Sequence, residues 1–185
     1  MRLLQIITSV TLLLFLNSFS IKTDQNEDYS KNKYKVYKNL DKALKKPEKV
    51  FSLDLSSQKI TELNPEITKL KNLKILRLHD NPLNKIPDLI FQLTRLEGLF
   101  MGHCSISEIP KGIANLKRLQ VLWLSDNKIT SIPTEIGELG ELQKLFLLNN
   151  NIHWDQYDSI KCLINDNCWV LLSYEFDGKP PHDCK

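Results

Sequence analysis

The sequence predicts an α/β solenoid with a concave sheet of short parallel strands and a convex side of irregular or 3-10 segments. Two observations predict this fold. The first is an eleven-residue pattern, L-x-x-L-x-L-x-x-N-x-I/L, which recurs five times at intervals of 23 residues. The second is the segment I-x-x-I-P-x-x-I-x-x-L, which follows three of the copies. Such periods are typical of repeat architectures, whose extended faces bind other macromolecules. The copies begin at Val50, Leu73, Leu96, Leu119 and Leu142.

Residues 1–20 are predicted to be a secretory signal peptide. Arg2 gives a positive start, an apolar run follows, and small residues precede a cleavage site after Ser20. The apolar run contains Gln, Thr and Ser, and it is shorter than the roughly 20 residues of a membrane-spanning helix. We therefore expect an exported protein, secreted or held in the cell envelope, without a stable membrane span. An uncleaved anchor is the alternative.

Residues 21–36 are polar and charged without apolar periodicity, which favours a flexible basic arm. Residues 37–49 are expected to form a helix that covers the open N-terminal end of the solenoid, because stacked repeats expose an apolar cross-section there. Lysines crowd this region, and we expect them to be solvated, with contact to an anionic surface as the alternative. The helical spacing is carried by Tyr37, Leu40, Ala43 and Leu44, and Pro47 ends it.

Residues 50–152 form the five repeats. In each copy the segment x-L-x-L-x alternates with period two, which predicts a short strand that pairs in parallel with the next copy about 4.8 Å away. The ninth position of the pattern holds Asn81, Asn127 and Asn150, whose amides are expected to satisfy backbone groups in nearby turns. Gln58 and Cys104 replace Asn there, and Cys104 is predicted to be a buried thiol. The predicted core side chains are Leu76, Leu78, Leu99, Met101, Leu122, Leu124, Leu145 and Leu147.

Prolines mark the return half of three repeats. Pro87, Pro110 and Pro133 each fix φ and lack a backbone donor, which suits an outer turn rather than a strand. The first copy departs from this pattern, because Asn64 takes that place and Pro65 comes one residue later.

Residues 153–185 are predicted to form a C-terminal helix-strand cap and a tail. The helix is expected over residues 154–164 and the strand over residues 168–176. An exported chain favours a disulfide. A bond from Cys168 to Cys184 is slightly preferred over one from Cys162 to Cys184. A zinc site made by some of these cysteines and His182 is the rival, although the spacing does not match the usual paired motifs.

The repeats resemble the 23-residue class of leucine-rich repeat. The N-terminal pattern from Tyr37 to Ile60, and the closing helix, Cys168 and strand up to Phe176, are similar to the secreted leucine-rich-repeat proteins of pathogenic leptospires. The resemblance covers roughly residues 37 to 176. It implies export and binding to proteins, including host proteins, and names no ligand. The departures are Cys104, the first copy without its Leu-Pro pair, and an additional cysteine in the tail.

The concave face is predicted to carry the binding residues. Side chains flanking the core leucines point outward, and three aromatic residues, Phe100, Trp123 and Phe146, fall in line on neighbouring strands. An exposed apolar patch marks interaction sites, and aromatics dominate binding hot spots. Gly98 and Gly102 are expected to leave Phe100 open. The alternatives are coverage by the chain's own ends and plain cross-strand stacking. The predicted partner-binding residues are Arg77, Phe100, Val121, Trp123, Phe146 and Leu148.

A polar group beside the aromatic line raises the question of chemistry. His79, Asp80, His103 and Asp126 fall on adjacent strands, where they could hold a metal. Polar edge residues of a binding face are the preferred interpretation. No nucleophile lies in an activating arrangement, and no phosphate loop, HExxH or CxxC motif is present. We therefore expect neither an enzyme nor a bound cofactor or metal.

The sequence thus predicts an exported protein-binding module. The net charge of +3 is too small to indicate nucleic acid. The expected partner is a protein, such as a host cell-surface or matrix protein. The alternative is a structural protein of the periplasm or cell surface that self-associates through the same apolar column.

Overall fold

The computed structural model describes residues 33–153, 156 and 168–172. The predicted signal peptide, most of the predicted arm, most of the predicted C-terminal helix, and the tail lie outside the described residues. The same holds for Cys162 and Cys184, so the predicted disulfide and its zinc rival remain predictions.

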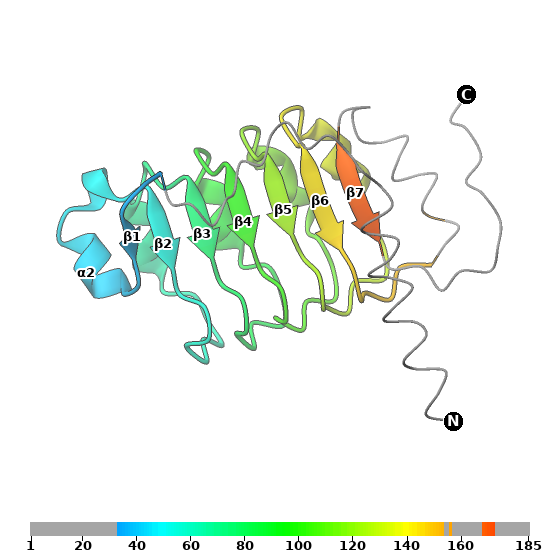
Figure 1. Ribbon diagram of the computed structural model, residues 1–185, viewed down its shortest axis with the longest axis horizontal. Coiled ribbons are helices and arrows are strands. Elements are labelled where there is room, and N and C mark those ends of the chain that lie inside the picture. The colour runs from blue at the N-terminus through cyan, green and yellow to red at the C-terminus, as the bar shows by residue number, and fades with distance from the viewer. Residues whose placement is uncertain (1–32, 154–155, 157–167, 173–185) are drawn as a thin grey trace, which may run out of the picture. The chain divides into compact units, whose positions relative to one another are not determined.

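The described residues contain a parallel sheet of seven strands in chain order (Figure 1). The five repeats pair with a constant offset of 23 residues: Leu53 lies opposite Leu76, and Leu76 opposite Leu99. The predicted parallel pairing and its register are therefore confirmed. The strands are β1 (Val36–Tyr37), β2 (Ser52–Asp54), β3 (Ile75–Arg77), β4 (Gly98–Phe100), β5 (Val121–Trp123), β6 (Lys144–Leu147) and β7 (Trp169–Leu172).

All eight predicted core side chains are buried, as expected from the two-residue alternation of a strand. They form one apolar cluster with the isoleucines and leucines of the return segments. Each strand therefore presents one set of side chains to this core and the other to the opposite side of the sheet. We call that opposite side the sheet face.

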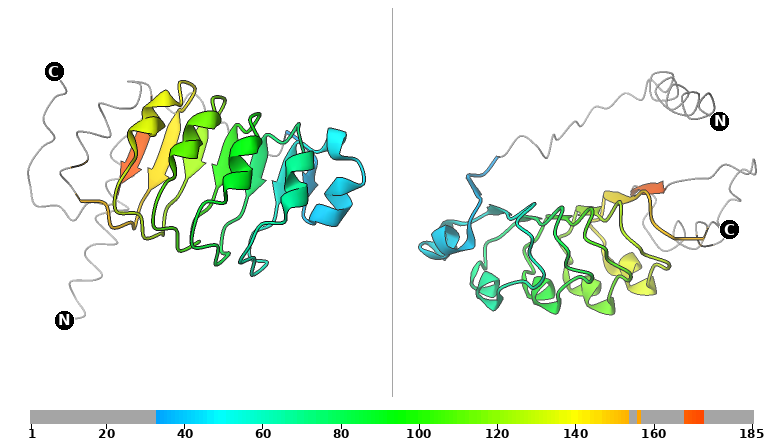
Figure 2. Two further views of the ribbon diagram at one scale, coloured as in Figure 1. Left: turned by 180° about the vertical axis from the view of Figure 1, so that it is seen from behind. Right: turned by 90° about the horizontal axis from the view of Figure 1, so that it is seen from below.

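Short 3-10 helices line the side opposite the sheet face (Figure 2), which confirms the predicted 3-10 character of the return segments. Pro87, Pro110 and Pro133 each occupy the position before such a helix, with φ between -65 and -72. In the first copy Asn64 holds this position and its side chain accepts a hydrogen bond from the Glu66 backbone N–H. The helices are η2 (Pro65–Lys69), η3 (Asp88–Gln92), η4 (Lys111–Asn115) and η5 (Thr134–Glu138).

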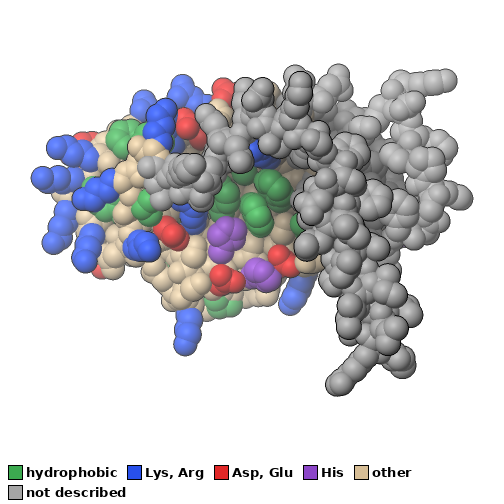
Figure 3. Space-filling model, viewed as in Figure 1, with side chains coloured by type: hydrophobic (Ala, Val, Ile, Leu, Met, Phe, Trp, Pro, Cys, Tyr) green, Lys and Arg blue, Asp and Glu red, His purple; other side chains and the backbone are tan. Residues whose placement is uncertain are grey.

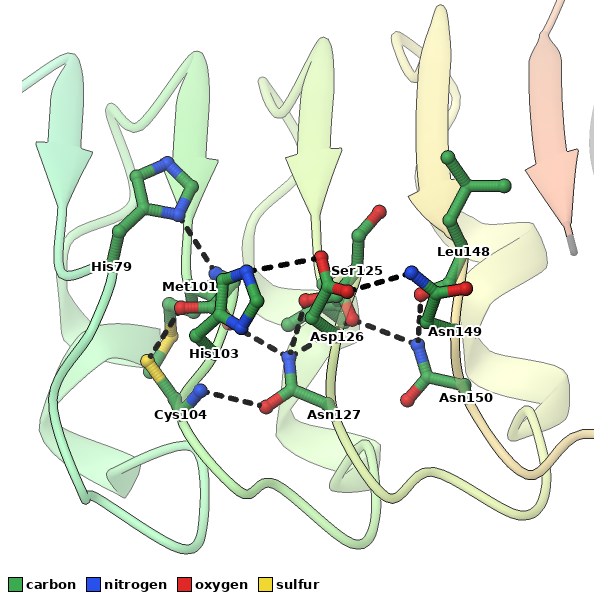
Figure 4. A network of polar contacts seen from close by, with 12 residues as sticks. His79, Met101, His103, Cys104, Ser125, Asp126, Asn127, Leu148, Asn149 and Asn150 are labelled. Carbon is green, nitrogen blue, oxygen red and sulfur yellow. Dashed lines mark hydrogen bonds and ion pairs between the residues drawn. The ribbon is translucent and has the colours of Figure 1, made fainter. Parts of the chain in front are cut away.

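Buried amides join the turns of successive repeats, as predicted. The Asn127 Nδ2 donates to three carbonyl oxygens at 2.8–3.3 Å, and its Oδ1 accepts from the backbone N–H groups of Cys104 and Ile106 (Figure 4). Asn81 repeats this arrangement one copy away from Cys104. Cys104 is a buried free thiol, as predicted, and its Sγ donates to the Leu78 and Gly102 carbonyls. Burial raises the pKa of this thiol.

Gln58 does not act as a buried amide. It is exposed, and its Nε2 donates to the Lys38 carbonyl at 3.0 Å. This side chain ties the first repeat to the segment that precedes it.

The N-terminal end differs in detail from the expected helix. Tyr37 lies in β1, which pairs with β2, while the helix α2 (Leu40–Leu44) begins after Asn39. The Asn39 side chain accepts from the Lys42 backbone N–H, an N-cap that the apolar spacing alone does not reveal. A 3-10 helix, η1 (Pro47–Lys49), then leads into the first repeat. Ala43 is fully buried in the core cluster.

The strand β7 lies within the predicted strand over residues 168–176 and pairs in parallel with β6. Lys144 lies opposite Trp169, so the offset here is 25 residues rather than 23. Cys168 is half-buried, and burial raises the pKa of its thiol to about 11. None of the helices in the part of the chain that the structure describes is long and apolar enough to cross a membrane.

Candidate functional site

The sheet face brings the predicted binding residues together. Strand pairing places Arg77 beside Phe100, Phe100 beside Trp123, and Trp123 beside Phe146. Figure 3 shows apolar side chains gathered over the middle of this face with histidines next to them. Arg77, Trp123, Phe146 and Leu148 are half-buried, so each keeps part of its surface exposed.

A continuous series of side-chain contacts runs from Arg77 on β3 to Phe146 on β6, through Phe100, His79 and Trp123. The Trp123 and Phe146 rings stack with centroids 4.5 Å apart and planes 26° apart. The Arg77 guanidinium carbon lies 5.2 Å from the centroid of the Phe100 ring, within the range of a cation–π contact. We call the set Arg77, His79, Phe100, Trp123 and Phe146 the aromatic cluster.

The expected exposure of Phe100 was wrong. The ring is only 7% exposed, and Val121 beside it is 1% exposed. Gly98 is the reason, because the space above it is filled by the ring: a Cβ on Gly98 would lie 2.8 Å from the Phe100 Cε2. The space next to Gly102 is likewise occupied by the side chains of His79 and Trp123. The two glycines therefore accept neighbouring rings and do not open the face.

His79 links the two halves of the aromatic cluster, a role that the sequence patterns did not indicate. Its ring centroid lies 5.9 Å from that of Phe100 and 6.0 Å from that of Trp123, which it meets edge-on. The Gly102 backbone N–H donates to its Nδ1 at 2.9 Å, so Nδ1 is unprotonated and the neutral ring carries its proton on Nε2. Burial lowers the pKa of His79. The Asp80 carboxylate opposes this by raising the pKa, and the Arg77 charge lowers it further.

The polar group beside the cluster has a backbone explanation. Ser57, Asp80, His103, Asp126 and Asn149 recur every 23 residues, and each has a φ between 53 and 60. Asn, Asp and His are the non-glycine residues that tolerate this left-handed conformation best. The repeated turn therefore selects these residue types without any ligand.

The same residues bind one another along the edge of the face. The His103 Nε2 lies 3.3 Å from the Asp126 Oδ2, and the Asn149 Nδ2 donates to the Asp126 Oδ1 at 2.7 Å (Figure 4). In the described residues, no group of three His, Cys, Asp or Glu side chains is placed to hold a metal ion.

One buried hydroxyl on this side of the sheet has no hydrogen-bond partner among the described residues. Ser125 is 1% exposed, and its Oγ is unsatisfied. An unsatisfied buried hydroxyl costs free energy. Ser125 therefore stabilises the folded protein less than an apolar side chain of similar size would.

Comparison with known proteins supports the repeat architecture. Residues 39–166 match the family described as leucine-rich repeat region. A leucine-rich-repeat protein of Leptospira interrogans is 37% identical, with a TM-score of 0.52 over 63% of this chain and 36% of that one. Internalin C2 of Listeria monocytogenes is 28% identical, with a TM-score of 0.60 over 74% of this chain and 57% of that one.

A third solved structure, a chain of the BIR3–SERK2 complex from Arabidopsis thaliana, is 27% identical. Its TM-score is 0.53, over 66% of this chain and 68% of that one. Comparison of the sequence with curated proteins gives no match. The chain thus spans about a third of the Leptospira protein and just over half of the Listeria protein.

Proposed function

Because this chain belongs to the leucine-rich repeat region family, we propose that it is an exported module that binds a protein partner on its sheet face. The family and its fold are typical of protein interaction, since stacked repeats present an extended surface. The proposal adds to this a location, an export route and a set of contact residues.

The half-exposed stack of Trp123 on Phe146 is the observation that carries the proposal. A solvated sheet face normally bears polar side chains, whereas this one carries two large half-buried rings together with half-buried Arg77 and Leu148. Trp and Arg are among the residues most enriched in binding hot spots. Phe100 and Val121 are too buried to contact a partner directly, so their proposed role is to support the exposed rings from below.

The proposed partner is a protein, and the resemblance to secreted leptospiral proteins favours a host protein at the cell surface or in the matrix. Export rests on the predicted signal peptide, which a secretion assay with residues 1–20 deleted tests directly. The proposed module carries out no catalysis and needs no cofactor.

A pull-down with the full chain as bait tests the binding site. Trp123→Ala should weaken capture of a confirmed partner by about 2 kcal/mol or more, because it removes a large, half-exposed ring from the face. Phe51→Ala is the matched control. It also removes a stacked ring, because Phe51 stacks on Tyr34 with centroids 5.3 Å apart, but Phe51 lies outside the aromatic cluster. Equal affinity of the wild type and Trp123→Ala would reject the proposed face.

Self-association through the same rings is the competing outcome. Light scattering over a concentration series separates the two uses of the face. A monomer at all concentrations favours a foreign partner, whereas a dimer that Trp123→Asp dissociates would show that the partner is a second copy of this chain.

A further inference from the structure

The positive charge of this chain is concentrated in one short segment. Residues 33–49 contain seven lysines and two acidic residues, a net charge of +5. The whole chain has 25 basic and 22 acidic residues, so the remainder has 18 and 20, a net charge of -2. We call the seven residues the lysine cluster: Lys33, Lys35, Lys38, Lys42, Lys45, Lys46 and Lys49.

The lysine cluster occupies one end of the repeat unit. Lys33 and Lys35 precede β1, and the other five members lie on or between β1, α2 and η1. The elements β1 and α2 pack against each other. All seven are exposed. Figure 3 shows blue side chains projecting in several directions from the end that carries these elements.

The cluster is not balanced by acidic neighbours in the part of the chain that the structure describes. The ion pairs there involve Lys69, Lys74, His103, Lys111 and Lys117, and none involves a member of the cluster. Mutual repulsion of like charges makes such an arrangement unfavourable in isolation. A polyanion bound to it would relieve that repulsion and release its own counterions.

The composition of this surface selects the class of partner. Every exposed residue between positions 33 and 49 is polar or charged. A protein interface requires an apolar or aromatic anchor and is depleted in lysine, and a membrane-bound helix inserts apolar side chains. Leu40 and Leu44 cannot serve as such anchors, because both pack against the core.

Nucleic acid fits the surface less well than a sulfated polymer. Single strands are held by stacking on available rings, but the Tyr34 ring already stacks on Phe51, and Lys35 lies 5.1 Å from the centroid of the Tyr37 ring. The cluster contains no arginine, the residue that reads base edges and grips phosphate in two-point contacts. Lysines act as point charges on flexible stems, which suits a linear chain of anionic groups.

We propose that the lysine cluster is a binding surface for a linear sulfated polysaccharide, separate from the aromatic cluster. Binding is electrostatic, so it requires neither a pocket nor a fixed register, and it weakens steeply with salt. The aromatic cluster takes no part in it.

Heparin binding to the full chain tests this proposal, measured by isothermal titration calorimetry from 50 to 300 mM NaCl. The test variant replaces three lysines on and next to α2: Lys42→Gln, Lys45→Gln and Lys46→Gln. The control variant removes the same charge from three exposed lysines of different repeats: Lys71→Gln, Lys85→Gln and Lys128→Gln. Circular dichroism melting checks that both variants fold.

We expect the test variant to bind heparin about tenfold or more weakly, because each lysine near a dense anion contributes severalfold. The slope of log K against log salt should fall by about 2. The control variant and Trp123→Ala should both bind like the wild type. The proposal is overturned if heparin does not bind, or if both lysine variants lose affinity equally. Tighter binding to double-stranded DNA or to vesicles with anionic lipid at the same salt would also overturn it.

Discussion

Exchanging the thiol and the amides of the buried row tests whether that row stabilises the solenoid. Asn81 and Asn127 each donate to three carbonyls and accept from two backbone N–H groups. Cys104, between them, makes two thiol hydrogen bonds, to the Leu78 and Gly102 carbonyls. The perturbation is Cys104→Asn, with Asn127→Cys as its reverse.

Pro82 explains why a thiol is tolerated at position 104. By the spacing of the other copies, an Asn at 104 would accept from the backbone N–H groups of Asn81 and Leu83. The Leu83 N–H instead donates to the Asn81 carbonyl at 2.8 Å, within its own turn. Lys59 and Ser105, which occupy the place of Pro82 in two other copies, have a φ of 58, a value closed to proline. The second turn therefore needs one acceptor fewer from the next copy.

The two substitutions should change stability in opposite directions. In Cys104→Asn, three amide hydrogen bonds replace two weaker thiol bonds, at about 1 kcal/mol each, while added volume in a packed core opposes the gain. We expect the free energy of unfolding to rise by about 1 kcal/mol. In Asn127→Cys, the buried N–H of Ile106 loses its acceptor, which costs about 1–3 kcal/mol, and the amide donors are lost as well. We expect a fall of about 3 kcal/mol.

Urea unfolding under reducing conditions, followed by circular dichroism, measures both changes. Adding Pro82→Lys to Cys104→Asn should yield a further gain beyond the sum of the single effects, since the Leu83 N–H then becomes available to the new amide. The reasoning is refuted if Cys104→Asn destabilises the protein as much as Asn127→Cys does, or if the double variant shows no coupling.

Three further predictions concern the sheet face and the C-terminal segment. Gly98→Ala should lower the free energy of unfolding by about 1–3 kcal/mol by displacing the Phe100 ring, as urea titration will show; an unchanged midpoint would contradict the packing described. The pKa of His79 is lowered in the folded state. The contribution of His79 to the free energy of unfolding is therefore fully present above its unfolded pKa of 6.5 and is lost as the pH falls below that value. Wild-type stability should therefore decline below pH 6.5 more than that of His79→Gln, and parallel pH profiles would reject this. A disulfide among the three C-terminal cysteines should survive in unreduced peptides by mass spectrometry. If it joins Cys168 to Cys184, its reduction should cost about 3 kcal/mol, the value for a loop of about 15 residues; three alkylatable thiols would favour zinc instead.

The sequence is sufficient to predict the strands, their register and the core of the repeats. The 23-residue period fixes which residues face each other, because every strand repeats the same two-residue alternation. Cys104 could be assigned to the core for the same reason, since a position in a repeat inherits the environment of its equivalents. Periodicity carries no such information for β1, which has two residues and lies outside the repeats.

The packing of the aromatic cluster could not be predicted from column positions. A column assigns a side chain to a face, but the rotamer of Phe100 depends on the empty space over Gly98. The linking role of His79 depends on the Gly102 backbone N–H, which no residue type signals. The left-handed turns were detectable, however, because Asp80, His103, Asp126 and Asn149 share one column and all tolerate positive φ.

The constant offset between strands has a consequence for how such a chain can change in length. The core positions, the strand pairing and the left-handed turn at Asp80, His103 and Asp126 recur at 23 residues, so an insertion or deletion of one whole period leaves each remaining column intact. It would lengthen or shorten the sheet face by one rung of about 4.8 Å. An insertion of any other size within a repeat would shift leucines out of the core of that copy. Duplication in units of one period is therefore the route by which this surface can be resized for a different partner without redesigning the fold.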